Sequence, residues 1–336
     1  MDIRTVANKL RSTVVDHPYY ELSYNRLYNL SAIAQPGSVI MVVGPTHVGK
    51  TMLSRKLLAT LVWSDSEKMS QDTSIVRIEA ATTDQGFIST RYLMLCLLAA
   101  LDHPFYVGDR NIRLSDSESM LRKRLVNAIK ARKTQYIIID EAHHLLRTKS
   151  DRRAEGALDS IKCLGNETNC VLIFVGGYEL LAYLFLSAHL NGRMTVIDFP
   201  NYGLDEQGII EFDRLLVTVD QWLPWARGMS LYKFRDHIYE GTQGCYGQLI
   251  HWSISAIAEM KSQGNHHLKL AHFLSTRRAG QVQAIKDDIA KGRLYLADLT
   301  KQAREIGVES PPDLSKSRSG RPFQRKPIRD RVGIDN

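Results

Sequence analysis

Cysteine is scarce in this chain, with four residues among 336, and no two of them are spaced as C-x-x-C. The four are Cys96, Cys163, Cys170 and Cys245. The histidine group His266, His267 and His272 also has no cysteine or carboxylate partner at the spacing that zinc sites use. We therefore expect reduced structural thiols and no metal at this histidine group, which argues against a disulfide-rich or zinc-stapled domain.

Long hydrophobic runs are also lacking. The longest, residues 92–101, has ten residues and is too short to cross a bilayer. The N-terminal stretch MDIRTVANKL lacks the apolar core of a signal peptide. With 44% apolar and 24% charged residues, the composition is that of an ordinary globular protein, and we expect a cytoplasmic protein without a membrane segment.

Acidic residues are fewer than basic ones, 36 against 44, and the net charge of +8 favours a polyanionic partner. Much of this surplus lies in residues 315–336, where seven basic and two acidic side chains leave +5. Prolines and serines accompany the charge, so residues 313–336 are predicted to form a disordered tail. Its role stays open between an arm that binds DNA, a docking tail for a partner protein and a solubilising tail.

The stretch GPTHVGKT, residues 44–51, matches the phosphate-binding pattern G-x-x-x-x-G-K-[S/T]. A strand-like apolar run precedes it at 38–43, and apolar residues at helical spacing follow at 52–58. This order lets main-chain N–H groups face phosphate oxygens, with Lys50 reaching the β- and γ-phosphates and Thr51 binding Mg²⁺. The predicted ATP-binding residues are Gly44, Pro45, Thr46, His47, Val48, Gly49, Lys50, Thr51 and Met52.

A second motif, YIIIDE at residues 136–141, is an apolar strand that ends in two carboxylates, the Walker B arrangement. Asp140 is predicted to hold hydrated Mg²⁺ together with Thr51. Glu141 is predicted to be catalytic, because a carboxylate here can orient and polarise the water that attacks the γ-phosphate.

Residues 140–143 also spell the DEAH box of a helicase class. Against a helicase, no Ser-Ala-Thr motif follows the next strand, and the chain has no room for a second helicase-sized domain. We interpret His143 and His144 as residues that begin a helix rather than as metal ligands.

Strand-like runs at 38–43, 75–80, 136–141, 171–175 and 195–199 alternate with helical patterns, and the pattern is helical throughout from Asp205. This order predicts an α/β fold, a P-loop NTPase core in which helices sandwich a parallel five-stranded sheet, followed by a small C-terminal helical lid. The expected parts are an N-terminal helical segment (1–31), the core (32–202), the lid (203–276), further C-terminal helices (277–312) and the basic tail (313–336).

Two of the helices can be predicted in more detail. Residues 115–133 are predicted to form an amphipathic helix with Ser115 as its N-cap and Glu118 as the capping-box partner. Near the N-terminus, Tyr20, Tyr24 and Tyr28 recur every four residues and are expected to lie on one helical face packed against the main domain.

The two motifs, with VLIFVGG at 171–177 and GRMTVIDF at 192–199, resemble those of AAA+ ATPases and, more narrowly, of transposition regulators of the TniB and TnsC type. The resemblance covers residues 18–276. It implies an ATP-dependent switch that assembles on double-stranded DNA as a ring of six or seven subunits or as a helical filament. The implied partners are transposase subunits and a target selector of the TniQ or TnsD type, which can be part of an RNA-guided complex.

The chain departs from this family at two positions. Gly176 and Gly177 stand where a polar sensor residue usually follows the fourth strand, and Gln248 stands where the lid often has a sensor arginine. Both departures remove γ-phosphate contacts and favour a slow switch over a motor. The resemblance also makes Arg193 a catalytic arginine finger for a neighbouring subunit, with a surface ion pair as the open alternative.

By the same resemblance, largely sequence-independent DNA contacts are expected from loops that follow the second strand, precede the third core helix and follow Walker B. These residues are Thr90, Arg91, Arg113, Ser115, Lys149 and Arg152. The alternative function is that of an AAA+ protein-remodelling or signalling ATPase without direct DNA binding. The basic surplus, and the lack of a recognisable aromatic-glycine pore loop, favour the DNA-binding function.

Overall fold

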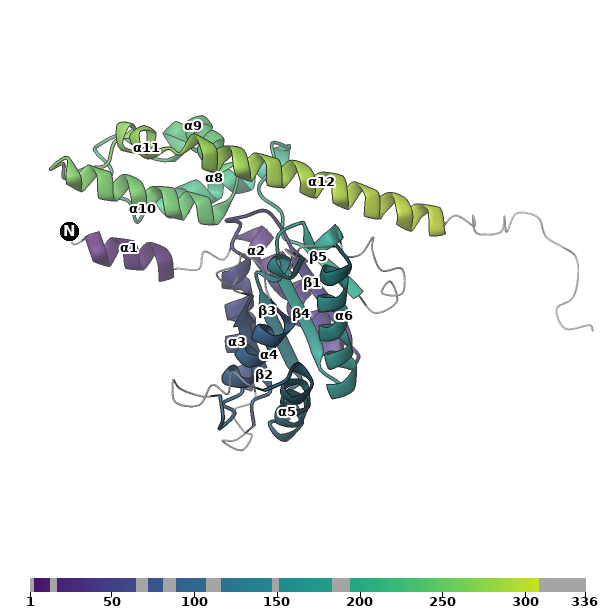
Figure 1. Ribbon diagram of the computed structural model, residues 1–336. Helices are drawn as coiled ribbons and strands as arrows, with labels where there is room; N and C mark the ends of the chain where they lie inside the picture. Colours follow the sequence, from purple (N-terminus) through teal and green to yellow (C-terminus); the bar gives the residue numbers. More distant parts are fainter. Residues whose placement is uncertain are drawn as a thin grey trace, which may run out of the picture. The chain divides into compact units, whose positions relative to one another are not determined.

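The computed structural model describes residues 3–12, 17–64, 72–80, 89–106, 116–146, 151–182 and 194–307 (Figure 1). Five parallel strands form one sheet in the order β2-β3-β4-β1-β5. They are β1 (Val39–Val43), β2 (Ile75–Glu79), β3 (Tyr136–Asp140), β4 (Val171–Gly176) and β5 (Met194–Asp198). The predicted α/β fold with a parallel five-stranded sheet is therefore confirmed, and this strand order is typical of an AAA+ core.

The apolar run before the phosphate loop becomes the inner strand β1. It pairs with β4 on one side and β5 on the other, with Val42 opposite Val175 and Ile197. All five of its residues are buried, which explains why the sequence there is uniformly apolar rather than alternating.

Helices of the first half of the chain accompany the sheet. They are α2 (Pro18–Ile33), α3 (Lys50–Ser64), α4 (Thr90–Ala100), α5 (Glu118–Ala131), the 3₁₀ helix η1 (Ala142–Leu146) and α6 (Asp151–Thr168). Helix α2 packs on α3, where the Tyr24 hydroxyl lies 2.6 Å from the hydroxyl of Thr60. The Lys56 ammonium lies over the rings of Tyr20 and Tyr24, 5.1 and 4.6 Å from their centroids. The predicted packing of this tyrosine face is confirmed, although Tyr28 remains exposed.

The predicted N-cap of α5 is wrong. The helix begins at Glu118, and its N-cap is Ser117, whose hydroxyl accepts a hydrogen bond from the N–H of Met120. Ser115, the predicted cap, lies outside the described residues. Glu118 is the first helical residue rather than the third, and it accepts a hydrogen bond from Thr90 instead of forming a capping box.

After β5 the described chain is helical. Its elements are α8 (Glu206–Asp220), η3 (Tyr232–Phe234), α9 (Arg235–Thr242), α10 (Tyr246–Ser262), α11 (Leu270–Thr276) and α12 (Ala279–Gly307). Helices α8 to α11 share a hydrophobic core that includes Phe212, Leu249 and Phe273, to which Val6 and Leu10 of α1 (Ile3–Ser12) also contribute. Ile285 and Ile289 of α12 form a separate cluster with Cys245. The domain boundaries given above remain a prediction. Residues up to Leu296 form one compact unit, and it contains every site discussed below.

The four cysteines are free thiols, as expected from their spacing. No helix in the described ranges combines the length and the apolar character needed to cross a bilayer.

Candidate active site

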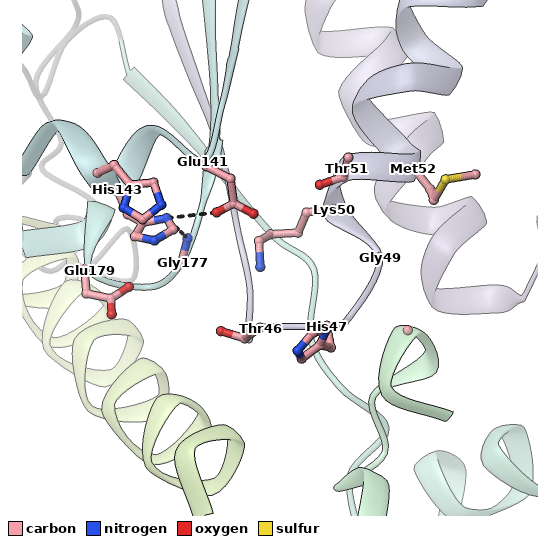
Figure 2. A pocket seen from close by; sticks show the side chains of 12 residues that line it. Thr46, His47, Gly49, Lys50, Thr51, Met52, Glu141, His143, Gly177 and Glu179 are labelled. Carbon is pink, nitrogen blue, oxygen red and sulfur yellow. Dashed lines mark hydrogen bonds and ion pairs between the residues drawn. The ribbon is translucent and has the colours of Figure 1, made fainter. Parts of the chain in front are cut away.

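Three loops meet at one edge of the sheet, because parallel strands all end on the same side. They follow β1, β3 and β4 and contain the phosphate loop, the carboxylate pair and the glycine pair, respectively. A cavity of about 490 Å³ is found here (Figure 2), lined by Thr46, His47, Gly49, Lys50, Thr51, Met52, Glu141, His143, His144, Gly177, Glu179 and Gly247.

Six of the nine predicted ATP-binding residues line this cavity. Gly44, Pro45 and Val48 do not, and they shape the loop instead. A Cβ at Gly44 would overlap the carbonyl oxygen of Phe199, so only glycine allows this close approach. Val48 is 2% exposed and belongs to the sheet core, which anchors the loop.

The loop ends in a helix N-terminus. Gly49 has a φ of +119°, which side chains rarely adopt, and Lys50 begins α3 directly after it. The first turn of a helix has N–H groups without intrahelical partners and the positive end of the helix dipole. This is the geometry that binds phosphate groups in P-loop proteins.

Lys50 is the buried cation of the site, with 8% of the residue exposed. Its ammonium donates hydrogen bonds to the carbonyl oxygens of Gly44 at 2.8 Å and Pro45 at 2.7 Å. Burial lowers the pKa of Lys50, and the negative charge of Glu141 opposes this by raising it. Figure 2 shows these two side chains next to each other.

Glu141 has a left-handed backbone, with a φ of 53°. Its Oε2 lies 3.2 Å from Nδ1 of His143, and that nitrogen also lies 3.4 Å from the N–H of Gly177. Protonated His143 therefore donates to Glu141, whereas neutral His143 can accept from Gly177. Burial raises the pKa of Glu141, and the ammonium of Lys50 lowers it. The carboxylate is thus directed into the cavity beside a cation, as a group that polarises water requires.

Asp140 is 1% exposed and does not line the cavity. Its Oδ2 forms an ion pair with the guanidinium of Arg77 on β2 and accepts a hydrogen bond from the hydroxyl of Ser54 at 3.3 Å. Its Oδ1 accepts from the N–H of Glu141 at 3.0 Å. Sequence analysis missed Arg77 because no local pattern marks it, and only the pairing of β2 with β3 brings it to Asp140.

A possible metal-ligand group lies beside Walker B. The side chains of Glu141, His143 and His144 offer ligand atoms within 4.8 Å of one another, the only such trio among the residues that the structure describes. Thr51 and Asp140, the predicted Mg²⁺ ligands, are not members of it. Both histidines lie in η1, so the prediction that they begin a helix is confirmed.

The helices after β5 contact the phosphate loop through α10. A Cβ at Gly247 would come within 2.5 Å of the carbonyl oxygen of His47, and the N–H of Gln248 donates to that same oxygen at 3.2 Å. Gln248, at the expected sensor position, is 4% exposed, and its Oε1 accepts from Gln281 at 3.0 Å. Gln248 therefore contacts the loop through its main-chain N–H, whereas its uncharged side chain bonds to Gln281.

Helix α12 also reaches the phosphate loop, although the sequence predicted nothing of this contact. Oδ2 of Asp288 accepts two hydrogen bonds from Thr46, from its N–H at 2.6 Å and its hydroxyl at 2.9 Å. Nε2 of Gln281 lies 3.3 Å from Nε2 of His47. Sequence reasoning missed Asp288 because 242 residues separate it from Thr46.

Two of the predicted DNA contacts, Thr90 and Arg91, are described, and neither lines this cavity. Thr90 and Arg91, at the start of α4, are half-buried and donate hydrogen bonds to Glu118 and to the carbonyl oxygen of Asp116, respectively. The other predicted positions are not described: Arg113, Ser115, Lys149 and the arginine-finger candidate Arg193 lie outside the described residues, and Arg152 falls in α6 without a described side chain.

Residues 33–184 match the family model for the AAA domain. This part of the chain is therefore similar to the AAA domain, a P-loop NTPase module. No curated protein sequence matches the chain.

Solved structures with a similar fold include origin-recognition proteins. The Aeropyrum pernix ORC1 protein in complex with DNA has 16% identity and a TM-score of 0.58, covering 78% of this chain and 65% of that one. The Aeropyrum pernix ORC2 protein in its ADPNP-ADP complexes has 14% identity and a TM-score of 0.53, covering 83% and 71%. Drosophila ORC bound to DNA has 13% identity and a TM-score of 0.53, covering 91% and 74%. At these sequence identities, the similarity to the origin-recognition structures is a similarity of fold alone.

Proposed function

We propose that this chain is an ATPase that binds ATP with Mg²⁺ and uses hydrolysis as a switch. The observation that carries the proposal is the convergence of Lys50, Thr51 and Glu141 on one cavity at the end of the sheet. In this assignment the loop amides and Lys50 bind the phosphates, Thr51 and Asp140 hold Mg²⁺, and Glu141 polarises the attacking water. Bound Mg²⁺ would supply charge neutralisation at the phosphates.

Hydrolysis is proposed to be slow. Gly177 presents only a main-chain N–H, which bonds to His143, at the position where a polar sensor side chain is expected. Gln248 is uncharged and bonded to Gln281. With neither position offering a charged group for the γ-phosphate, less stabilisation of the transition state is available.

We further propose that the ATP-bound protein assembles on double-stranded DNA and acts as a regulator of transposition, between a target selector and transposase subunits. The resemblance of the two motifs to the TniB and TnsC type supports this role, as does the net charge of +8. Two structures with a similar fold, the ORC1 protein and Drosophila ORC, are described as bound to DNA. Charge-based contacts of this kind would go to phosphates and be largely blind to sequence.

Size-exclusion chromatography with a labelled duplex tests the proposal. Protein with MgATP should co-elute with DNA as a large species, and protein with MgADP should not. Lys50→Ala removes the cation aimed at the phosphates, so nucleotide binding and DNA assembly should be lost together. ATP binding without any DNA retention would instead favour a remodelling or signalling ATPase.

A further inference from the structure

Asp288 places a carboxylate directly on the phosphate loop. The same oxygen accepts from the N–H and the hydroxyl of Thr46, the third residue of the motif, at 2.6 and 2.9 Å. Both residues belong to the same compact unit of the chain. Figure 2 shows Thr46, with the yellow-green ribbon of α12 at the lower left of the view. The Asp288 carboxylate therefore accepts a hydrogen bond from a main-chain N–H of a loop whose geometry suits the binding of anions.

The contact belongs to a continuous face of α12. Gln281, Ile285, Asp288 and Gly292 recur at intervals of four, three and four residues, so they lie on one side of the helix. Ile285 is 1% exposed and packs in a cluster with Cys245, next to the start of α10. A Cβ at Gly292 would overlap the ring of Tyr178, which follows β4.

This face spans several parts of the nucleotide site. Gln281 bonds to Gln248 of the lid, Asp288 bonds to the phosphate loop, and Gly292 packs on the segment after β4. Helix α12 is therefore seated on the elements that surround the cavity. A movement of the phosphate loop, or of a ligand bound to it, would therefore act directly on α12.

The charge of Asp288 opposes phosphate binding. Its carboxylate lies 2.6 Å from the N–H of Thr46 and 2.9 Å from the Thr46 hydroxyl, within the loop whose donors would bind the phosphates. A negative charge at this position repels the negatively charged phosphate groups. Each additional phosphate raises the repulsion, so a triphosphate is affected more than a diphosphate.

We propose that Asp288 is a specificity-determining residue that disfavours ATP relative to ADP while α12 is docked, so that ATP binding is coupled to release of α12 from the phosphate loop. The inference rests on the proposed nucleotide binding. In this proposal the γ-phosphate and the Asp288 carboxylate compete for the same region of the loop. The nucleotide state would therefore control whether α12 is docked on the loop. Binding of ATP then frees this face of α12, and return to ADP restores the contact.

Isothermal titration of the full chain with MgATP and MgADP tests the proposal. Asp288→Asn keeps an oxygen that accepts from Thr46 but removes the charge, so the Kd for ATP should fall about tenfold and the Kd for ADP by clearly less. Asp287→Asn is the matched control, because Asp287 is exposed and its Oδ1 accepts from Gln283 at 2.8 Å. It should leave both affinities unchanged.

Hydrogen exchange provides a second measurement on the wild-type chain. Amides of residues 281–292 should exchange faster with MgATP than with MgADP, and this difference should shrink in Asp288→Asn. An unchanged ATP-to-ADP preference in Asp288→Asn, or equal protection of these amides with both nucleotides, would overturn the role of Asp288 and leave nucleotide binding standing. Failure of wild type and Asp288→Asn alike to bind either nucleotide would overturn both proposals.

Discussion

Arg77 of β2 and Asp140 at the end of β3 form an ion pair, and both side chains also bond to the hydroxyl of Ser54. The Asp140 side chain is 2% exposed and that of Arg77 is 14% exposed, so the pair is largely removed from water. The Walker B aspartate is therefore held by the neighbouring strand and by the phosphate-loop helix together. This network fixes the spacing between the two motifs of the site.

Loss of Arg77 should destabilise the protein. In Arg77→Met the buried Asp140 carboxylate loses its charged partner, and the free energy of unfolding should fall by about 3 kcal/mol. Urea unfolding without nucleotide measures this change. Arg277→Met is the control: it breaks an ion pair with Glu240, whose side chain is 54% exposed, and should lower the free energy of unfolding far less than Arg77→Met does. Equal effects of the two substitutions would show that the Arg77 pair does not organise the site.

The ion pair between Arg77 and Asp140 could not be predicted from the sequence, although the motif that contains Asp140 could. The phosphate loop and Walker B were predictable because their residues are close along the chain and their spacing follows directly from strand, turn and helix geometry. Arg77 and Asp288 bond to partners 63 and 242 residues away, and nothing local distinguishes them from other charged residues. They became visible only when strand pairing and helix docking were known.

The prediction of the N-cap of α5 was wrong for a different reason. Serines at 115 and 117 both precede acidic residues, so the sequence offers two alternative caps. The choice depends on backbone dihedral angles: Ser117 has a ψ of 155° and the residues after it are helical. Element type was therefore predictable here, whereas the boundary was not.

Glu141→Gln should separate binding from hydrolysis. The amide keeps the size of the side chain but cannot polarise water as a carboxylate does, so phosphate release should fall at least about 100-fold while the Kd for MgATP changes little. Glu179→Gln is a matched control, since Glu179 lines the same cavity from the segment after β4. A comparable loss of phosphate release in both variants would remove the distinction on which the catalytic assignment of Glu141 depends.

Gly247→Ala should disturb the junction between the lid and the phosphate loop. The new Cβ would lie 2.5 Å from the carbonyl oxygen of His47, so α10 must move away from the loop. We expect the Kd for ATP to rise about tenfold, within the range that overpacking costs. At Gly280 a Cβ meets nothing within 4 Å, and Gly280→Ala should leave the Kd unchanged. An unaltered Kd in Gly247→Ala would mean that the lid contact does not contribute to nucleotide binding.

DNA binding, if it is electrostatic, should weaken steeply with salt and vary little among unrelated duplexes. Arg91→Ala should lower affinity for every duplex and flatten the slope of log K against log salt by roughly one unit for each phosphate that a subunit no longer neutralises. Arg91 also donates to the carbonyl oxygen of Asp116, so a purely structural role would reduce stability without changing this slope. Arg91→Lys, which keeps the charge, should restore most of the slope but not the hydrogen bond to Asp116.

If deletion of residues 315–336 abolished binding while Arg91→Ala left affinity and slope untouched, the basic tail would be the DNA-binding element and the assignment to the start of α4 would be wrong.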